Sequence, residues 1–186
     1  MIKSLCIILL SFLISPDLES KKEVYITNNA KVRLYSEAPL ENIEATSVKG
    51  FSVYNTQSAD IQFSIPINSF KFKKSLMQEH FNENYMESDK YPFAKFKGKI
   101  TQQIDPGKDG EYNVSATGEL DVHGVKRQRT IKGSIRVAKG IITVNSKFDV
   151  LCKDHNIKIP QLVFQNIAES IQLTVSAIYN PYTASK

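Results

Sequence analysis

The chain has no tryptophan, only two cysteines and only three histidines among its 186 residues. Cys6 lies in an apolar N-terminal run that we expect to be removed, which leaves Cys152 without a partner for an internal disulfide. His80, His123 and His155 are far apart in the sequence, without paired carboxylates at the spacing of metal ligands. We therefore expect no metal site, and a fold that depends on its hydrophobic core.

The motifs of several enzyme classes are missing as well. The sequence has no nucleophile elbow, no Gly-rich phosphate-binding loop and no dinucleotide fingerprint. Cys152 and His155 superficially resemble a thiol catalytic pair, but such pairs usually come from distant segments. We predict a protein that is not an enzyme and needs no cofactor. A thiol enzyme that uses Cys152 and His155 stays open as an alternative.

The N-terminal apolar run is too short to cross a bilayer comfortably. It covers residues 5–14, follows Lys3 and ends at Ser15-Pro16, whereas a spanning helix needs about 20 apolar residues. This order is typical of a signal peptide. We predict a signal peptide over residues 1–20, a single mature domain over residues 21–186, and a periplasmic or secreted location.

Strict alternation of apolar and polar residues is the most informative pattern that the chain does contain. Between Tyr112 and Val122 every second residue is apolar or small, and the same holds from Ile131 to Val137. This period is typical of β-strands with one buried face. His123-Gly124 lies between the two segments, where Gly can adopt the positive φ that a hairpin requires. The apolar face also carries small residues, which leave room for curvature or for a ligand: Ala116, Gly118 and Gly133.

The rest of the chain repeats this alternation, with one exception. We expect further strands over residues 24–35, 43–54, 61–67, 94–100, 142–150 and 171–179. Residues 73–88 instead place apolar side chains at helical spacing, before Pro92. The sequence predicts an all-β fold, an antiparallel barrel of about eight strands with one short helix near residues 73–88.

Two blocks resemble the YceI-like family. The segment Gly-Glu-Leu-Asp-Val-His-Gly-Val-Lys at 118–126 is similar to the family's G-x-L-x-x-x-G strand and turn. Residues 75–96 are similar to its short helix, aromatic-Pro step and Phe-bearing strand. The resemblance covers most of residues 23–180. It implies a lipocalin-like barrel, secreted or periplasmic, that holds a long isoprenoid or another lipid chain.

Alternation alone does not decide whether the barrel is filled with side chains or hollow, since either suits eight strands. The resemblance favours a cavity for a polyisoprenoid, a quinone or a fatty-acyl lipid. We expect its lining to consist of Phe63, Phe96, Tyr112, Val114, Phe148 and Leu173. We expect the helix to cover its mouth with Leu76, Met77, Phe81 and Met86.

Basic residues form two groups on the strands. One group is Lys95, Lys97 and Lys99, and the other is Lys126, Arg127, Arg129, Lys132 and Arg136. The aromatic residues lie on the opposite faces, so nucleic acid is not an expected partner. The formal net charge of +5 favours an anionic membrane surface as a partner, because opposite charges attract. A solid-cored structural or adaptor protein of the envelope, acting through its basic face, stays open as an alternative, and so do the monomeric and dimeric states.

Overall fold

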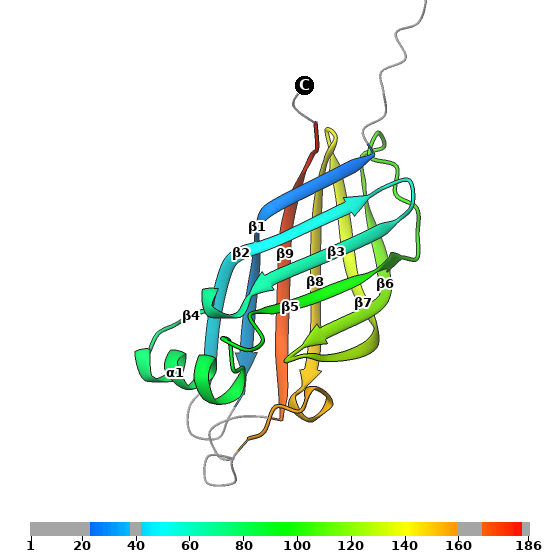
Figure 1. Ribbon diagram of the computed structural model, residues 1–186. Coiled ribbons are helices and arrows are strands. Elements are labelled where there is room, and N and C mark those ends of the chain that lie inside the picture. The colour runs from blue at the N-terminus through cyan, green and yellow to red at the C-terminus, as the bar shows by residue number, and fades with distance from the viewer. Residues whose placement is uncertain (1–22, 38–41, 160–168, 184–186) are drawn as a thin grey trace, which may run out of the picture.

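The computed structural model describes residues 23–37, 42–159 and 169–183. Long antiparallel strands form a barrel, and one short helical segment lies at its lower end in Figure 1. The strands are β1 (Val24–Ser36), β2 (Ile43–Asn55), β3 (Asp60–Pro66), β5 (Phe93–Ile100), β6 (Gly110–Val122), β7 (Val125–Ala138), β8 (Ile141–Leu151) and β9 (Ser170–Pro181). The predicted signal peptide, residues 1–20, lies outside the described residues.

The sheet closes on itself. Its strand order is β1-β9-β8-β7-β6-β5-β3-β2, and β2 pairs with β1 to complete the ring. A two-residue strand, β4 (Lys71–Phe72), adds to β2 beside the short β3. The predicted antiparallel barrel of about eight strands with one short helix is confirmed.

Local sequence explains the bends of β1 and β2. The β1–β2 register shifts between Thr27 and Ala30, around Asn28-Asn29, and again near Gly50. A side-chain carbon at Gly50 would lie 2.8 Å from the carbonyl oxygen of Ala30. Only glycine therefore allows the two strands to approach each other at this bulge.

The β6–β7 hairpin has a two-residue turn in which both residues are left-handed. His123 has φ 53° and Gly124 has φ 70°, as in a type I′ turn, whose twist matches that of the flanking strands. Further along the same hairpin, a Cβ at Gly118 would collide with the backbone of β5. The small residues on this face thus let β5 and β6 coil tightly around the barrel.

The helical segment is shorter and less regular than a helix over residues 73–88. α1 (Ser75–His80) continues into a π-helical turn, η2 (Phe81–Tyr85). Two 3₁₀ turns, η1 (Ile67–Ser69) and η3 (Cys152–His155), also lie at the lower end. Within the described residues, no helix has the length and apolar character that a membrane span requires.

The barrel interior is unevenly filled. At the upper end in Figure 1, the core side chains are almost completely buried. We call this end the packed half, defined by Tyr25, Tyr54, Ile104, Ile142 and Tyr179. At the lower end a smaller cluster is buried, formed by Val32, Leu34, Ala45, Ile65 and Phe70. Beside it, the inward-facing side chains of Phe63, Phe148 and Leu173 are only partly buried. Free internal space is therefore expected in this lower half.

Candidate ligand-binding cavity

The lower half of the barrel contains an apolar cavity of about 210 Å³. We call this part the hollow half; it contains the ends of β1, β3, β6 and β8 and the starts of β2, β5, β7 and β9. An engineered apolar cavity of about 150 Å³ stays dry and binds benzene. A cavity of this size and lining therefore suits an apolar guest better than water.

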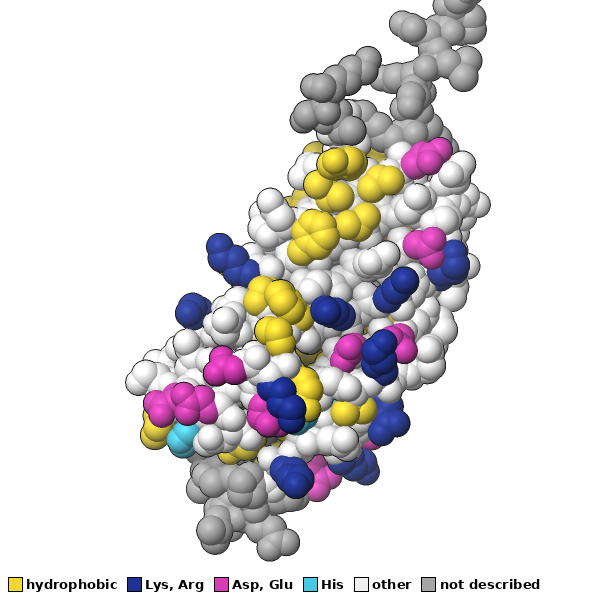
Figure 2. All heavy atoms as spheres, viewed as in Figure 1, with side chains coloured by type: hydrophobic (Ala, Val, Ile, Leu, Met, Phe, Trp, Pro, Cys, Tyr) yellow, Lys and Arg dark blue, Asp and Glu magenta, His cyan; other side chains and the backbone are white. Residues whose placement is uncertain are grey.

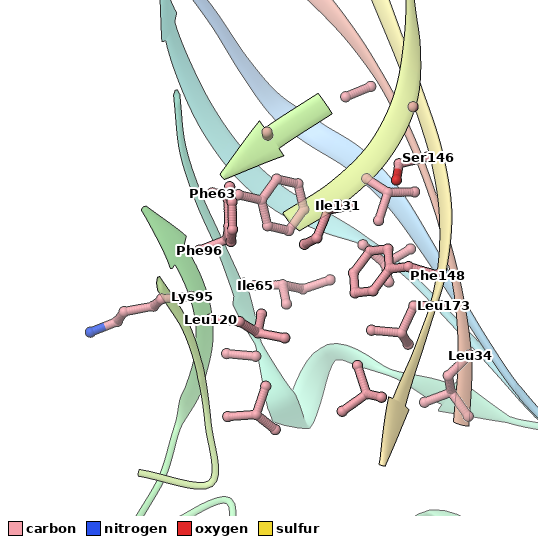
Figure 3. Close-up of a pocket in the computed structure, with 18 of the residues that line it drawn as sticks. Leu34, Phe63, Ile65, Lys95, Phe96, Leu120, Ile131, Ser146, Phe148 and Leu173 are labelled. Atoms are coloured by element: carbon pink, nitrogen blue, oxygen red, sulfur yellow. The ribbon is translucent and has the colours of Figure 1, made fainter. Parts of the chain in front are cut away.

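The wall of the cavity is built by paired strands. Phe63 of β3 lies directly opposite Phe96 of β5, and Phe148 of β8 lies opposite Leu173 of β9. Figure 3 shows these side chains, with Ile131, directed into a common space from different sides of the barrel. The packed half closes the cavity above, where Ile135 and Tyr179 complete the lining.

Seven of the ten side chains predicted from the sequence line this cavity. They are Phe63, Phe81, Met86, Phe96, Val114, Phe148 and Leu173. The strand residues among them come from the alternation of β3, β5, β6, β8 and β9. Phe81 and Met86 come from the π-helical turn and the residue that follows it, where Phe81 packs edge-on against Phe70 at 5.7 Å between ring centroids. Whether these side chains contact a bound lipid stays a prediction.

The other three predicted residues lie elsewhere. Leu76 is 58% exposed, and neither it nor Met77 contributes to the cavity wall, because the helical segment packs through its later part. Tyr112 shares the inward register of β6, but it lies toward the packed half. There its hydroxyl donates a hydrogen bond to the carbonyl of Lys108 at 3.1 Å. Tyr112, which we expected on the wall, therefore does not line the cavity, and neither do Leu76 and Met77, which we expected to cover its mouth. Whether these three side chains contact a bound lipid stays a prediction.

Cys152 lines the cavity but lacks the environment of a nucleophile. Burial raises the pKa of its thiol to about 11, whereas reactive cysteines have a lowered pKa. His155 is also buried, and its Nδ1 lies 3.0 Å from the carbonyl oxygen of Val125. Its ring is therefore oriented by the β7 backbone. The geometry gives no support to a thiol enzyme at Cys152 and His155.

The His123 side chain contacts the His155 backbone below the cavity. Their distance in the sequence does not predict this contact. His123 Nδ1 lies 3.1 Å from the carbonyl oxygen of His155, and His123 Nε2 lies 2.8 Å from Glu87 Oε2. The ring of Tyr91 packs edge-on against that of His123. These contacts join the β6–β7 turn to η3 and to the segment after η2. Among the described residues, no group of three or more potential ligand side chains could hold a metal ion.

The packed half has its own polar network. The Tyr179 hydroxyl donates to Ser52 Oγ at 2.7 Å, and Ser52 Oγ donates to the carbonyl of Gln62 at 2.6 Å. The neighbouring Tyr54 hydroxyl is buried and has no hydrogen-bond partner among the residues that the structure describes. Burial raises the pKa of both Tyr54 and Tyr179 to about 12. The interior of the packed half therefore encloses polar hydroxyl groups as well as apolar side chains.

The outer surface carries charges of both signs. Figure 2 shows Lys and Arg side chains interspersed with Asp and Glu on one face of the barrel. Lys99 Nζ lies 2.9 Å from Asp60 Oδ1, and Lys126 Nζ lies 3.0 Å from Glu119 Oε1. Figure 3 shows Lys95 pointing away from the cavity. Each predicted basic group therefore includes at least one lysine in an ion pair.

Comparison with solved structures agrees with the architecture. A polyisoprenoid-binding domain from Saccharophagus degradans superposes with a TM-score of 0.72 at 15% identity, over 87% of this chain and 100% of that domain. BcnA from Burkholderia cenocepacia gives a TM-score of 0.68 at 16% identity, over 80% and 95% of the two chains. The YceI protein of Campylobacter jejuni gives 0.55 at 16% identity, over 98% and 100%. At such identities these similarities establish the fold.

Sequence comparison identifies the family. No curated protein matches the chain, but the family model of the YceI-like domain matches residues 29–179. This range extends from within β1 to within β9 and includes every strand of the barrel. The chain therefore belongs to the YceI-like family.

Proposed function

We propose that this chain is an exported lipid-binding protein that holds the apolar chain of its ligand in the hollow half of the barrel. The observation that carries the proposal is the apolar cavity of about 210 Å³ inside a closed sheet. Each buried CH₂ group of a ligand contributes about 0.8 kcal/mol. Affinity would therefore come mainly from the length of the chain that the cavity encloses.

The ligand class follows from the lining. Phe63, Phe96 and Phe148 offer flat apolar surfaces, and Met86 adds a flexible side chain that adapts to irregular shapes. A polyisoprenoid, a quinone tail or a fatty-acyl chain would fit such a lining. The similarity to a polyisoprenoid-binding domain from Saccharophagus degradans favours the first of these.

The role proposed is binding rather than catalysis. The thiol of Cys152 has a raised pKa of about 11 because it is buried, so it is a poor nucleophile near neutral pH. The remaining lining is almost entirely hydrocarbon, which favours retention of a lipid over its conversion. Export rests on the N-terminal run of residues 5–14, and an exported barrel with a net positive charge would meet anionic membrane surfaces.

Native mass spectrometry of the mature protein, purified without detergent, tests the proposal. The expected result is a stoichiometric adduct that organic solvent extracts and that fragmentation identifies as a long-chain lipid. The N-terminus of the same material gives the cleavage site, and fractionation of the source cells gives the compartment. An apo mass that takes up no added isoprenoid alcohol, quinone or fatty acid would contradict the proposal and favour the envelope adaptor.

A further inference from the structure

The barrel wall is incomplete between β7 and β8. All of β7 from Val125 to Val137 pairs with β6, but only Gly133 to Ala138 pairs with β8. On the other side, residues 147–151 of β8 pair with β9 alone. In Figure 1 the lower part of β7 bends across in front of β8 instead of running beside it. We call the space between residues 125–132 and residues 147–151 the β7–β8 split.

The split differs from a second divergence in the wall. The early part of β2 also separates from β3, but backbone fills that gap, because β4 pairs with Ala45 and Thr46. η1 closes it further, since Ser69 Oγ lies 2.6 Å from Ser47 Oγ. At the β7–β8 split, η3 packs against the start of β7, but no strand of the described residues pairs with β7 at residues 128–132 or with the facing edge of residues 147–151.

The cavity reaches the split. Its wall includes Ile131 and Lys132 from the β7 edge, and Phe148 and Val150 from the β8 edge. Figure 3 shows Ile131 and Phe148 facing the same space from these two strands. A ligand in the hollow half would therefore lie directly behind the split.

Two arginine side chains of β7 reach away from the strand: Arg129 spans the split to β8, and Arg127 reaches η3 at its lower end. Arg129 Nη2 donates to the carbonyl of Asp149 at 2.7 Å, and Arg127 Nε donates to the carbonyl of Asp154 at 2.8 Å. Arg129 Nη1 also lies 3.8 Å from Asp154 Oδ2. The distances show that long side chains replace the ladder hydrogen bonds that the wall lacks here.

The positions of these arginines are unusual for a barrel. Arg129 pairs with Gly118 and Arg127 pairs with Leu120, and residues directly opposite each other project to the same face of a sheet. Both arginine side chains therefore leave β7 on the face that points into the barrel. Burying an unpaired cation inside a closed barrel is costly, but the split gives these side chains access to solvent and to carbonyl partners.

Both ends of the split are fixed. At the upper end, Ser146 Oγ donates to the carbonyl of Lys132 at 2.7 Å. At the lower end, the buried His155 contacts the carbonyl of Val125. Between these contacts, the hydrogen bonds of Arg129 and Arg127 join the described residues across the split, and water can replace these hydrogen bonds when they open. The split is thus a bounded opening with a reversible closure.

We propose that the β7–β8 split is the portal through which the lipid chain enters and leaves the cavity, with Arg127 and Arg129 as its latch. This inference rests on the proposed function, since a portal requires a cargo. Removal of such a latch lowers the free-energy barrier to both uptake and release of the ligand. It therefore changes the rates of uptake and release equally and leaves the dissociation constant unchanged.

Stopped-flow fluorescence with cis-parinaric acid, a polyene fatty acid that brightens in apolar surroundings, tests the latch. The mature protein, with its lipid extracted, is compared with the double variant Arg127→Gln, Arg129→Gln. The matched control is Arg33→Gln, which removes an exposed arginine of β1 that pairs with Glu44. We expect uptake and release to accelerate by about tenfold in the double variant, because two weak net hydrogen bonds no longer oppose opening, and to stay unchanged in the control.

A cross-link provides the converse test, in which a covalent bridge takes the place of the hydrogen bond between Arg129 and β8. Arg129→Cys and Asp149→Cys are joined by a short bismaleimide, and the same variant treated with a monofunctional maleimide is the control. Cys152 should react slowly, because burial raises its thiol pKa to about 11. We expect the cross-link to slow uptake and release by about tenfold or more, because opening must then distort a covalent bridge.

The outcomes separate the portal from the proposed function. Wild-type exchange rates in both the double variant and the cross-linked protein would overturn the portal and leave the lipid-binding function intact. A weaker affinity caused by faster release alone would overturn the latch, because the arginines would then hold the ligand itself. Failure of the wild-type protein to take up the probe at all would overturn both proposals.

Discussion

The two halves of the barrel use the same strands and the same alternation, yet one is filled and the other is hollow. In the packed half, Tyr54, Ile142 and Tyr179 are at most 1% exposed. In the hollow half, Phe63, Phe148 and Leu173 point inward but stay partly exposed. Alternation therefore determines which side chains point into the barrel. The distance between opposite walls determines whether those side chains fill the interior. A binding site can arise from the same pattern that builds a core.

The largest expected difference between the halves is in the cost of truncating isoleucine. Ile142→Ala in the packed half should lower the free energy of unfolding by about 2–5 kcal/mol, because it leaves a new cavity. Ile131→Ala should cost about 1–2 kcal/mol, because Ile131 already borders empty space and its loss creates less new cavity surface. Urea titration of both variants measures the difference. Equal losses would contradict the distinction between the halves.

High pH should act on the packed half. Burial raises the pKa of Tyr54 and Tyr179 to about 12, against about 10 in an unfolded chain. Below pH 10 both states keep the protons and stability is unaffected. Between about pH 10 and 12 the unfolded chain ionises first, so stability should fall by up to about 1.4 kcal/mol per pH unit for each tyrosine.

The free energy of unfolding, measured against pH, checks this slope. Tyr54→Phe is the control, because it removes one of the two buried phenols and should make the decline above about pH 10 shallower. An identical decline in this variant would show that other groups cause the alkaline loss.

Filling the hollow half should weaken ligand binding. Ala116 lines the cavity, and Ala116→Leu would occupy space equal to about three methylene groups of a ligand. At about 0.8 kcal/mol each, the affinity for cis-parinaric acid should fall by about ten- to hundredfold. Ser115→Leu, one residue away on the opposite face of β6, is the matched control. Unchanged affinity in a folded Ala116→Leu protein would argue against this cavity as the binding site.

The smallest expected effects on stability distinguish Tyr179 from Tyr54. Tyr179→Phe removes the hydrogen bond to Ser52 and should cost about 0.5–1.5 kcal/mol. Tyr54→Phe removes a buried hydroxyl that has no partner among the described residues, so it should be neutral or slightly stabilising. Thermal unfolding at neutral pH ranks the two variants. The reverse order would mean that the Tyr54 hydroxyl makes the more valuable contact.

The sequence predicts the barrel well because strand alternation is a local property. The β6–β7 hairpin is clear from Tyr112 to Val137, and the inward faces of β5, β6 and β8 identify Phe96, Val114 and Phe148. These residues need only the period of two and their neighbours along the chain. The type of fold and most of the cavity wall follow from this information.

The sequence predicts the positions of side chains less well where packing between distant segments determines them. Leu76 and Met77 are at helical spacing with Phe81, but of this segment only Phe81 and Met86, from the π-helical turn and the residue after it, reach the cavity. The contact between His123 and His155 depends on where η3 lies beneath the β6–β7 turn. Spacing in the sequence carries no information on either.

The β7–β8 split was also not predicted, although the sequence contained a signal for it. Closeness in the sequence indicates one basic group, formed by Lys126, Arg127, Arg129, Lys132 and Arg136. Counting back from Ile131, however, places Arg127 and Arg129 on the inward register. Cations at inward positions of a barrel strand indicate that the wall is open beside them.

A crystal structure of the mature protein, purified with its natural cargo, tests the central claim most directly. We expect continuous elongated density in the hollow half, in contact with Phe63, Ile131 and Phe148, that ends below Tyr179. Closure of the space by these side chains alone, or ligand density in the packed half, would contradict a lipid-binding hollow half.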